Sequence, residues 1–185
     1  YAGSPVPSVT ACVLPGTGCT PGAVTAGIWS AASGTVTTSG ARYSEVGAFA
    51  MKLVDTGFAG VDAADGSSAA EMAIESAAVN VGRFVPDHFE LTAASVPQFK
   101  TFNDTACPTR SFSYVGQPFG YLTLPQATIA AKNAAGATTL NYAGTLWKLV
   151  PAGVTQTYTA VSGTLDVGLV GTAAVSENGN GTGAL

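Results

Sequence analysis

Apolar and polar residues alternate along several short stretches of the chain, and the clearest of these stretches follows Pro86. Phe89 and Leu91 occupy alternate positions, and the positions between them are polar. A period of two is typical of a half-buried β-strand, in which successive side chains point to opposite faces. The pattern therefore predicts a strand from about His88 to Thr92, with Phe89 and Leu91 on its buried face.

A second alternating stretch lies between residues 41 and 55. Its large apolar residues share the odd-numbered positions, and they are Tyr43, Phe49, Met51 and Leu53. Gly47 interrupts the stretch and is predicted to lie at a bulge or a turn. A helix would place apolar residues three and four positions apart, so this stretch is predicted to be a strand.

The other predicted strands are short and are separated by Gly, Pro and Asn. In the second half they cover residues 111–115, 123–133, 138–142, 145–150, 155–161 and 165–175, with a hairpin turn at 133–136. A spacing of about 8–12 residues between such strands is typical of a sandwich or a barrel. Residues 67–78 fit a helix and a strand equally well. The glycine-rich tail from Glu177 onward is predicted to lack a closing strand.

Pro86 marks the predicted boundary between two domains. Proline lacks an N–H and favours extended geometry in the residue before it, here Val85, which suits the start of a strand or a crossing between domains. We therefore predict an all-β fold of two tandem immunoglobulin-like β-sandwiches. The first covers residues 1–85 and begins with a loose segment rich in Pro and Gly. The second covers residues 86–185 and is expected to be truncated at its C-terminal end.

The composition indicates an exported protein. Only 10% of the residues are charged, against a typical share of about 25%. A surface this poor in charge is covered by Thr, Ser, Asn and Gly, which is usual in extracellular β-proteins. The net charge is −4 and the seven Lys and Arg residues are scattered, so the basic stripe that nucleic acid binding requires is missing.

The chain also has no predicted membrane span, because none of its apolar runs approaches the length of about 20 residues that crosses a bilayer. It starts at Tyr1 and shows no signal peptide. We therefore expect a processed protein or a piece of a longer one.

Three cysteines cannot all form pairs with one another. Cys12 and Cys19 enclose a turn-rich loop that can bring their Cα atoms within disulfide range. Cys107 is left over, and its partner is either one of these two or a cysteine outside the chain. Three cysteines and one distant histidine make a zinc site improbable, since such a site takes about four ligands.

Four acidic residues form a candidate calcium loop, and they are Asp55, Asp62, Asp65 and Glu71. Ca²⁺ takes about six to eight oxygen ligands, which loops of a β-sandwich can supply. An EF-hand does not fit, because aligning Gly66 with its invariant glycine puts Val61 and Met72 at ligand positions. The alternative is a set of ordinary Asp-Gly turns, in which the aspartate bonds its own backbone. No other cofactor is predicted.

No catalytic residue is predicted. Asp87 and His88 are the one carboxylate–imidazole pair adjacent in the sequence, but neighbours in a strand face opposite sides and should not cooperate. The Gly-x-Ser-x-Gly elbow that would supply a nucleophile does not occur. The protein is therefore predicted not to be an enzyme.

Aromatic residues leave two interpretations open. They are a sugar-stacking platform or the filling of the sandwich cores, and the residues concerned are Trp29, Trp147, Tyr121 and Tyr142. The alternation from Thr145 to Val150 places Trp147 with Leu149 on a core face and Lys148 outside. Trp29 is expected to be the more exposed tryptophan.

Four sequence islands resemble one family of bacterial surface proteins. The islands are Tyr43-Ser-Glu-Val-Gly-Ala-Phe, Gly82-Arg-Phe-Val-Pro-Asp-His-Phe-Glu-Leu, Ser113-Tyr-Val-Gly-Gln-Pro-Phe and Thr138-Thr-Leu-Asn-Tyr-Ala-Gly. In this order they resemble the MshQ-like proteins of the DUF6701 family, which are encoded with the mannose-sensitive haemagglutinin type IV pilus of Gram-negative bacteria. The resemblance implies a β-rich extracellular protein associated with pili or adhesion, and it carries over no catalytic residue.

The expected function is that of a non-enzymatic structural or adhesin-type module on the surface of a Gram-negative bacterium. Its expected partners are other domains of the same surface protein or pilus components. The alternative is a carbohydrate-binding module of a larger exoprotein, for which the partner is a surface glycan.

Overall fold

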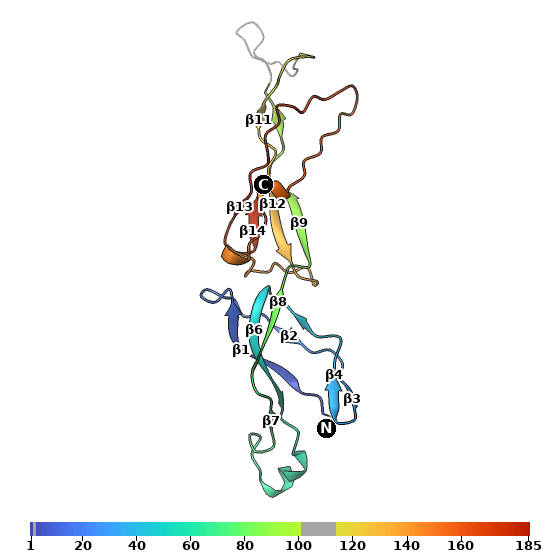
Figure 1. Cartoon of the computed structure of the whole chain (residues 1–185), viewed down its shortest axis with the longest axis vertical. Coiled ribbons are helices and arrows are strands. Elements are labelled where there is room, and N and C mark those ends of the chain that lie inside the picture. The colour runs from blue at the N-terminus through green and yellow to red at the C-terminus, as the bar shows by residue number, and fades with distance from the viewer. Residues whose placement is uncertain (2, 101–113) are drawn as a thin grey trace.

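The fold is all-β, as predicted, and consists of several antiparallel sheets along an elongated chain (Figure 1). The computed structural model describes residue 1 and residues 3–100 and 114–185. The predicted strand at 111–115 falls mostly outside this range, and Tyr114 and Val115 lie in a turn region rather than in a strand. That the sheets form immunoglobulin-like sandwiches stays a prediction.

The first sheet is built around one long central strand. Its strands are β1 (Val6–Leu14), β6 (Gly47–Asp55), β7 (Ile74–Glu75) and β8 (Val79–Phe84). Strand β6 pairs with β1 on one side, and with β7 and β8 in succession on the other. The prediction of a strand after Gly47 is confirmed. The region 67–78 contains β7 and no α-helix, and the 3₁₀ turn η1 (Gly60–Asp65) precedes it.

Gly47 lies where the β6–β8 register shifts, as its predicted place at a bulge requires. Its φ of 105° is in the left-handed region that favours glycine. A Cβ atom at this position would lie 2.2 Å from the carbonyl oxygen of Leu14. The glycine therefore lets β1 and the start of β6 approach closely.

Two small ribbons extend the first half of the chain. They are β2 (Val24–Thr25) with β5 (Arg42–Tyr43), and β3 (Ser30–Ala32) with β4 (Thr35–Thr37). Strand β5 brings Tyr43 onto Phe49 and Phe84, with ring centroids 4.2 Å and 5.2 Å away. Phe49 is only 1% exposed, so this aromatic cluster is the core of the first half.

The second sheet has the order β13-β14-β12-β9. Its strands are β9 (His88–Ala93), β12 (Ala127–Lys132), β13 (Ser176–Glu177) and β14 (Thr182–Ala184). Phe89 and Leu91 pair with Ala131 and Ile129, so they share the predicted face of β9. The prediction that Phe89 and Leu91 are buried is wrong, because their side chains remain 40% and 61% exposed and alternation alone does not supply a layer that covers the face.

The prediction of a tail without a closing strand is wrong. Residues 176–184 form the β13–β14 hairpin, and β14 occupies an interior position beside β12. Gly183 allows this placement, because a Cβ atom there would lie 2.5 Å from the ring of Trp147. The glycines that suggested a loose tail instead permit close packing.

Three predicted strands in the second half do not form. Residues 145–150, 155–161 and 165–175 contain no β-strand, and the region instead holds the 3₁₀ turns η2 (Gly144–Leu146) and η3 (Pro151–Gly153). Residues 138–142 make a single bridge, between Lys132 and Thr138. The remaining ribbon is β10 (Gln98–Phe99) with β11 (Tyr121–Thr123). Local alternation predicted strands in these segments, but a strand forms only where a neighbouring strand accepts its hydrogen bonds.

The chain passes from the first sheet to the second between Phe84 and His88. Strand β8 pairs with β6, whereas β9 pairs with β12, so no sheet runs continuously through Pro86. One buried cluster nevertheless joins residues from both sides of Pro86, namely Val46 with Ala131 and Tyr142. The division into domains at 85 and 86 stays a prediction.

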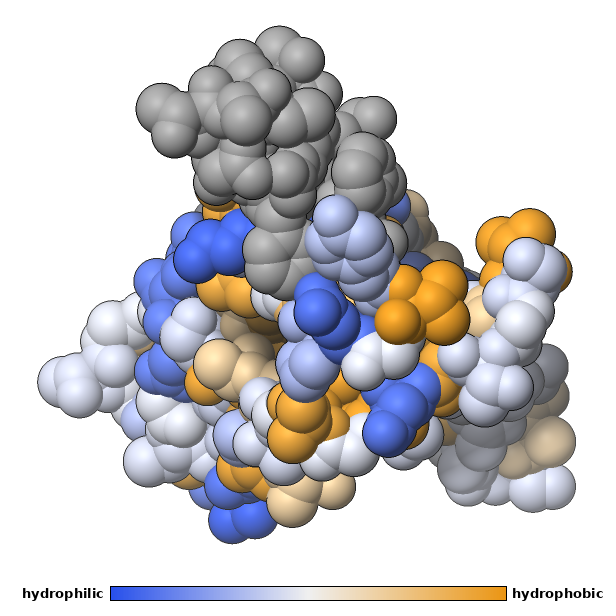
Figure 2. Space-filling view, turned by 90° about the horizontal axis from the view of Figure 1, so that it is seen from above, coloured by the Kyte–Doolittle hydropathy of each residue, from blue (hydrophilic) through white to orange (hydrophobic). Residues whose placement is uncertain are grey.

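On the face drawn in Figure 2, strongly hydrophilic residues are scattered among apolar residues and residues of intermediate hydropathy. Figure 2 shows apolar residues as separate patches between residues of intermediate hydropathy. No helix among the described residues is long and apolar enough to cross a membrane.

Candidate functional site: a polar junction between the two sheets

Glu45 is the centre of a polar junction that connects the two halves of the chain. Its carboxylate accepts hydrogen bonds from the backbone N–H of Leu140 and of Asn141, one on each oxygen and both at 3.1 Å. Glu45 is 9% exposed. A buried carboxylate needs such donors, because an unpaired charge in the interior is costly. The loop before β6 is therefore tied to a loop about 95 residues further along the chain.

Asn141 extends the junction to a third segment. Its side-chain Oδ1 accepts a hydrogen bond from the N–H of Thr20, and its Nδ2 donates to the carbonyl oxygen of Thr20, both at 2.8 Å. The amide thus pairs with one backbone residue as a neighbouring strand would. Asn141 is 3% exposed and Thr20 is exposed, so the two bonds lie at the rim of the junction and are partly shielded from water.

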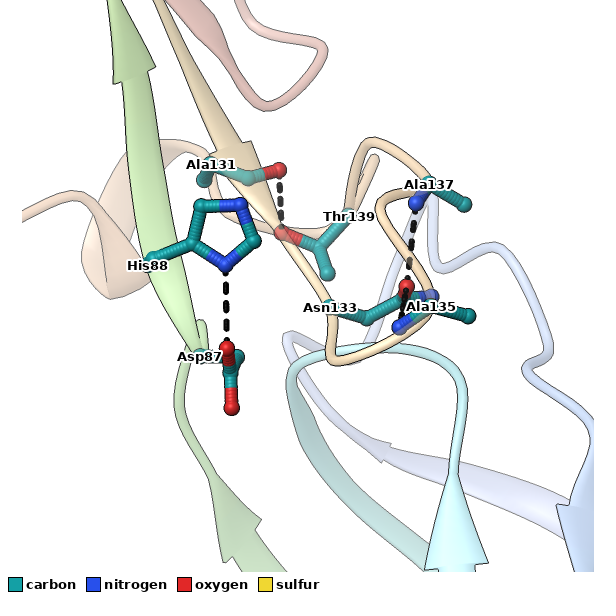
Figure 3. A network of polar contacts seen from close by, with 7 residues as sticks. All are labelled: Asp87, His88, Ala131, Asn133, Ala135, Ala137 and Thr139. Carbon is teal, nitrogen blue, oxygen red and sulfur yellow. Dashed lines mark hydrogen bonds and ion pairs between the residues drawn. The ribbon is translucent and has the colours of Figure 1, made fainter.

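The hairpin turn at Asn133 supports the same junction. Asn133 Oδ1 accepts hydrogen bonds from the N–H groups of Ala135 and Ala137, and Nδ2 donates to the carbonyl oxygen of Ser44. Thr139 follows the turn and donates its hydroxyl to the carbonyl oxygen of Ala131 (Figure 3). The predicted turn at 133–136 is confirmed, and its side chains hold the segment that reaches Glu45.

The sequence island that contains Glu45 also supplies Tyr43 and Phe49 to the aromatic core of the first half. Tyr43, Phe49 and Phe84 stack together, and the Tyr43 hydroxyl accepts a hydrogen bond from the N–H of Gly22. These rings, with Trp29 and Arg42, line a hollow of about 100 Å³. Ligand pockets usually measure roughly 300–1,000 Å³, so the hollow is a packing defect rather than a site for a whole sugar.

The sulfur atoms of Cys12 and Cys19 lie at disulfide-bonding distance, and their Cα atoms are 6.3 Å apart. This separation is within the range that a disulfide requires. Cys19 immediately precedes Thr20, so the loop that the two cysteines close ends at the junction. Cys107 lies outside the described residues.

The four acidic residues of the candidate calcium loop are not brought together. No group of three or more His, Cys, Asp or Glu residues that could hold a metal ion occurs in the described part of the chain. Asp55 accepts hydrogen bonds from the N–H of Gly57 and from the Tyr1 hydroxyl, and the carboxylate raises the pKa of Tyr1 to about 12.

Two of the other acids of the candidate loop, Asp65 and Glu71, have local partners. Asp62 is exposed in η1. Asp65 accepts hydrogen bonds from the N–H and hydroxyl of Ser67. Glu71 accepts them from the N–H and hydroxyl of Ser68, and these bonds lower the pKa of Glu71. In the structure, Asp55, Asp65 and Glu71 thus act as caps of their own turns.

Asp87 and His88 do contact one another, contrary to the expectation from strand geometry. His88 Nδ1 lies 2.9 Å from Asp87 Oδ2 (Figure 3). The reason is that β9 begins at His88, so Asp87 is outside the strand and free to turn toward the ring. Both side chains are about half exposed, and the contact is a surface ion pair when the imidazole is protonated.

Two aromatic residues of the second half, Tyr142 and Trp147, belong to its core, whereas several others are exposed, namely Phe89, Phe99, Tyr114, Phe119 and Tyr158. Tyr142 is buried, and Trp147 and Leu149 pack against the cluster that contains it. The Trp147 indole N–H donates to the carbonyl oxygen of Leu149 at 2.9 Å. Lys148 is exposed. Trp147 and Leu149 therefore face the core and Lys148 faces outward, as predicted, although the segment is not a strand. Trp29 is half-buried and lines the hollow. The ring centroids of Tyr121 and Phe99 are 5.1 Å apart.

Residue-by-residue reasoning missed Glu45 and Asn141. Each looks like an ordinary polar residue in its local sequence, because their partners are more than 90 positions away. One signal was available: Glu45 lies in the first of the four islands and Asn141 in the last. The first and last islands mark two of the segments that meet at the junction.

A substitution at Glu45 tests the junction. We expect Glu45→Gln to lower the free energy of unfolding by roughly 1.5–3 kcal/mol, because the amide can accept at only one oxygen and turns N–H groups toward the Leu140 or Asn141 donor. Chemical denaturation measures this change. Glu71→Gln is the matched control, because Glu71 also accepts a backbone hydrogen bond but is exposed and local. Equal effects of the two variants would contradict the assignment of Glu45.

Comparison with known proteins agrees with the islands. Residues 45–184 match the model of the third domain of DUF6701. Searches of curated proteins and of solved structures find no match. The matched range begins at Glu45, runs through both sheets and includes the whole of β14. Because the match covers well over half of the chain, this protein belongs to the DUF6701 family.

Proposed function

We propose that this chain is a non-enzymatic structural or adhesin-type module of an extracellular protein on a Gram-negative bacterium, associated with type IV pili. The observation that supports the proposal is the place of the island residues in the structure. Their polar side chains Glu45 and Asn141 tie the two sheets together, and their aromatic side chains Tyr43, Phe49 and Phe84 fill the core. These residues therefore hold an elongated molecule together.

Two further features support an extracellular site. The surface is poor in charge, and Cys12 and Cys19 lie at bonding distance. Disulfides persist in oxidising compartments such as the periplasm and the cell exterior. The partners of such a module are other domains of the same surface protein or components of the pilus.

The experiment replaces the chain in the bacterium that encodes it. Substituting the coding region for residues 45–184 by a flexible Gly/Ser linker of the same length should reduce attachment of the cells to surfaces. An unrelated rigid β-sandwich protein of similar length in the same place separates the two forms of the proposal. Restored attachment indicates a structural spacer, and continued loss indicates an adhesive contact made by this chain. Unchanged attachment with the flexible linker would contradict both forms.

The alternative is a carbohydrate-binding module. Trp29 supports it, because this tryptophan is half-buried at the edge of the aromatic hollow and presents part of its ring. A glycan would then stack on Trp29 from outside instead of entering the hollow. Reproducible binding of the purified chain to a glycan array, lost in Trp29→Ala, would favour this function over the structural one.

A further inference from the structure

We propose that the loop closed by Cys12 and Cys19 is a redox-sensitive latch, which holds the segment Leu140–Asn141 of the second half against the first sheet. The proposal does not depend on the function proposed above. It rests on the position of the two cysteines relative to the polar junction.

One end of the loop is fixed in the first sheet. Cys12 lies in β1 and is paired with Phe49 of β6, the most deeply buried aromatic residue of the core. Its backbone therefore cannot move without disturbing the sheet. The bond to Cys19 transfers this fixed position across a loop whose middle residues Gly16, Thr17 and Gly18 are exposed.

The other end of the loop is the contact with the second half. Thr20 follows Cys19 directly, and its N–H and carbonyl oxygen both pair with the side chain of Asn141. Asn141 Nδ2 also lies 3.5 Å from Cys19 Sγ. The backbone N–H of the same Asn141 donates to Glu45. A shift of Thr20 would therefore displace Asn141, whose backbone N–H donates to the Glu45 carboxylate.

The covalent bond matters because the loop is rich in glycine. Two glycines flank Thr17, both with positive φ, and glycine segments have many accessible conformations when they are not constrained. A disulfide removes most of these conformations. Without it, Thr20 would spend less time in the one position that pairs with Asn141, and the two amide bonds would open more often.

The chemical step is a thiol–disulfide exchange with a dithiol. The Cys12–Cys19 bond breaks, two electrons and two protons pass to the sulfur atoms, and two thiols form while the dithiol becomes a cyclic disulfide. Exchange with a protein disulfide in an oxidising compartment closes the latch again: the two thiols give up two electrons and two protons, and the partner disulfide is reduced to a dithiol. The hydrogen bonds of the junction then open rarely in an oxidising compartment and more often in a reducing one.

Hydrogen exchange of the backbone amides measures the latch directly. In the native chain, treatment with dithiothreitol should accelerate exchange of the Thr20, Leu140 and Asn141 amides by roughly ten- to a hundredfold. The amides of Ser76 and Ala94 are the internal controls. They bond to Leu53 and Gln126, away from the junction, and their exchange should not change.

The possible results separate clearly. Unchanged exchange at Thr20 and Asn141 would overturn the proposal. A general acceleration that includes Ser76 and Ala94 would also overturn it, because the bond would then stabilise the whole fold and not the junction. Peptide mapping after alkylation of free thiols must show Cys12 joined to Cys19. A bridge from either of them to Cys107 would likewise reject the latch.

A double-mutant cycle provides the second measurement. The Cys12→Ser/Cys19→Ser protein should exchange at Leu140 as the reduced chain does and should not respond to dithiothreitol. Asn141→Ala keeps both cysteines but removes the side chain that forms hydrogen bonds with Thr20. In this variant, reduction should no longer accelerate exchange of the Leu140 amide. Additive effects of reduction and Asn141→Ala would show that the loop and the junction act independently.

Discussion

Replacing Phe49 by alanine should lower the free energy of unfolding by about 3–5 kcal/mol, the usual effect of emptying a large aromatic site in a core. Phe49 is 1% exposed, and its ring stacks on those of Tyr43 and Phe84. The change removes most of the apolar contact that holds β5 and β8 against β6. Denaturation by urea, followed by tryptophan fluorescence, measures the loss.

The control for this experiment is Phe58→Ala. Phe58 is 54% exposed and its ring lies 6.0 Å from that of Tyr1 near the N-terminus. Its removal should change stability by less than about 1 kcal/mol. A Phe49→Ala protein as stable as the Phe58→Ala protein would contradict the placement of the core in the first half.

Trp147→Ala should lower the free energy of unfolding by about 3 kcal/mol, at the low end of the range for tryptophan because the side chain is half-buried. Its ring centroid lies 5.2 Å from that of Tyr142, and the ring covers the backbone of β14 at Gly183. The substitution would therefore leave a cavity beside the tail strand and expose β12. Lys148→Ala is the matched control, because the Lys148 side chain is exposed and only its backbone N–H bonds to Tyr142.

The same variant tests whether Trp147 is a core residue or a glycan-stacking residue. If Trp147 belongs to the core, Trp147→Ala melts at a lower temperature. If the chain binds glycans through Trp147, the variant keeps its melting temperature and loses binding on a glycan array. A stable Trp147→Ala protein would overturn the assignment of this residue to the core.

The junction also bears on the proposed structural role. Val46 packs against Ala131 and Tyr142, and the neighbouring Glu45 bonds to Leu140 and Asn141. Apolar and polar contacts therefore cross between the two sheets at the same place. A connection of this kind resists bending more than a single-chain linker at Val85 and Pro86 would, because several side chains must separate together. A rigid rod is what a projecting structural module requires.

The sequence by itself determined the fold class and several local features. The alternation around Phe89 predicted β9 and the shared face of Phe89 and Leu91, although both side chains are exposed and not buried, and the same reasoning predicted the strand after Gly47. Asn133 and Gly136 predicted their own turn. These features are local: a strand face follows from a period of two, and a turn follows from the residues within it.

Only the tertiary structure decided which segments pair and which polar residues are buried. Residues 155–175 alternate like strands yet remain irregular, whereas the glycine-rich tail contributes the interior strand β14. Glu45 and Asn141 became recognisable as a site only once their segments, 96 positions apart, were seen together. A strand and a buried carboxylate both depend on hydrogen-bond partners that distant segments supply, and alternation within one segment carries no information about those partners.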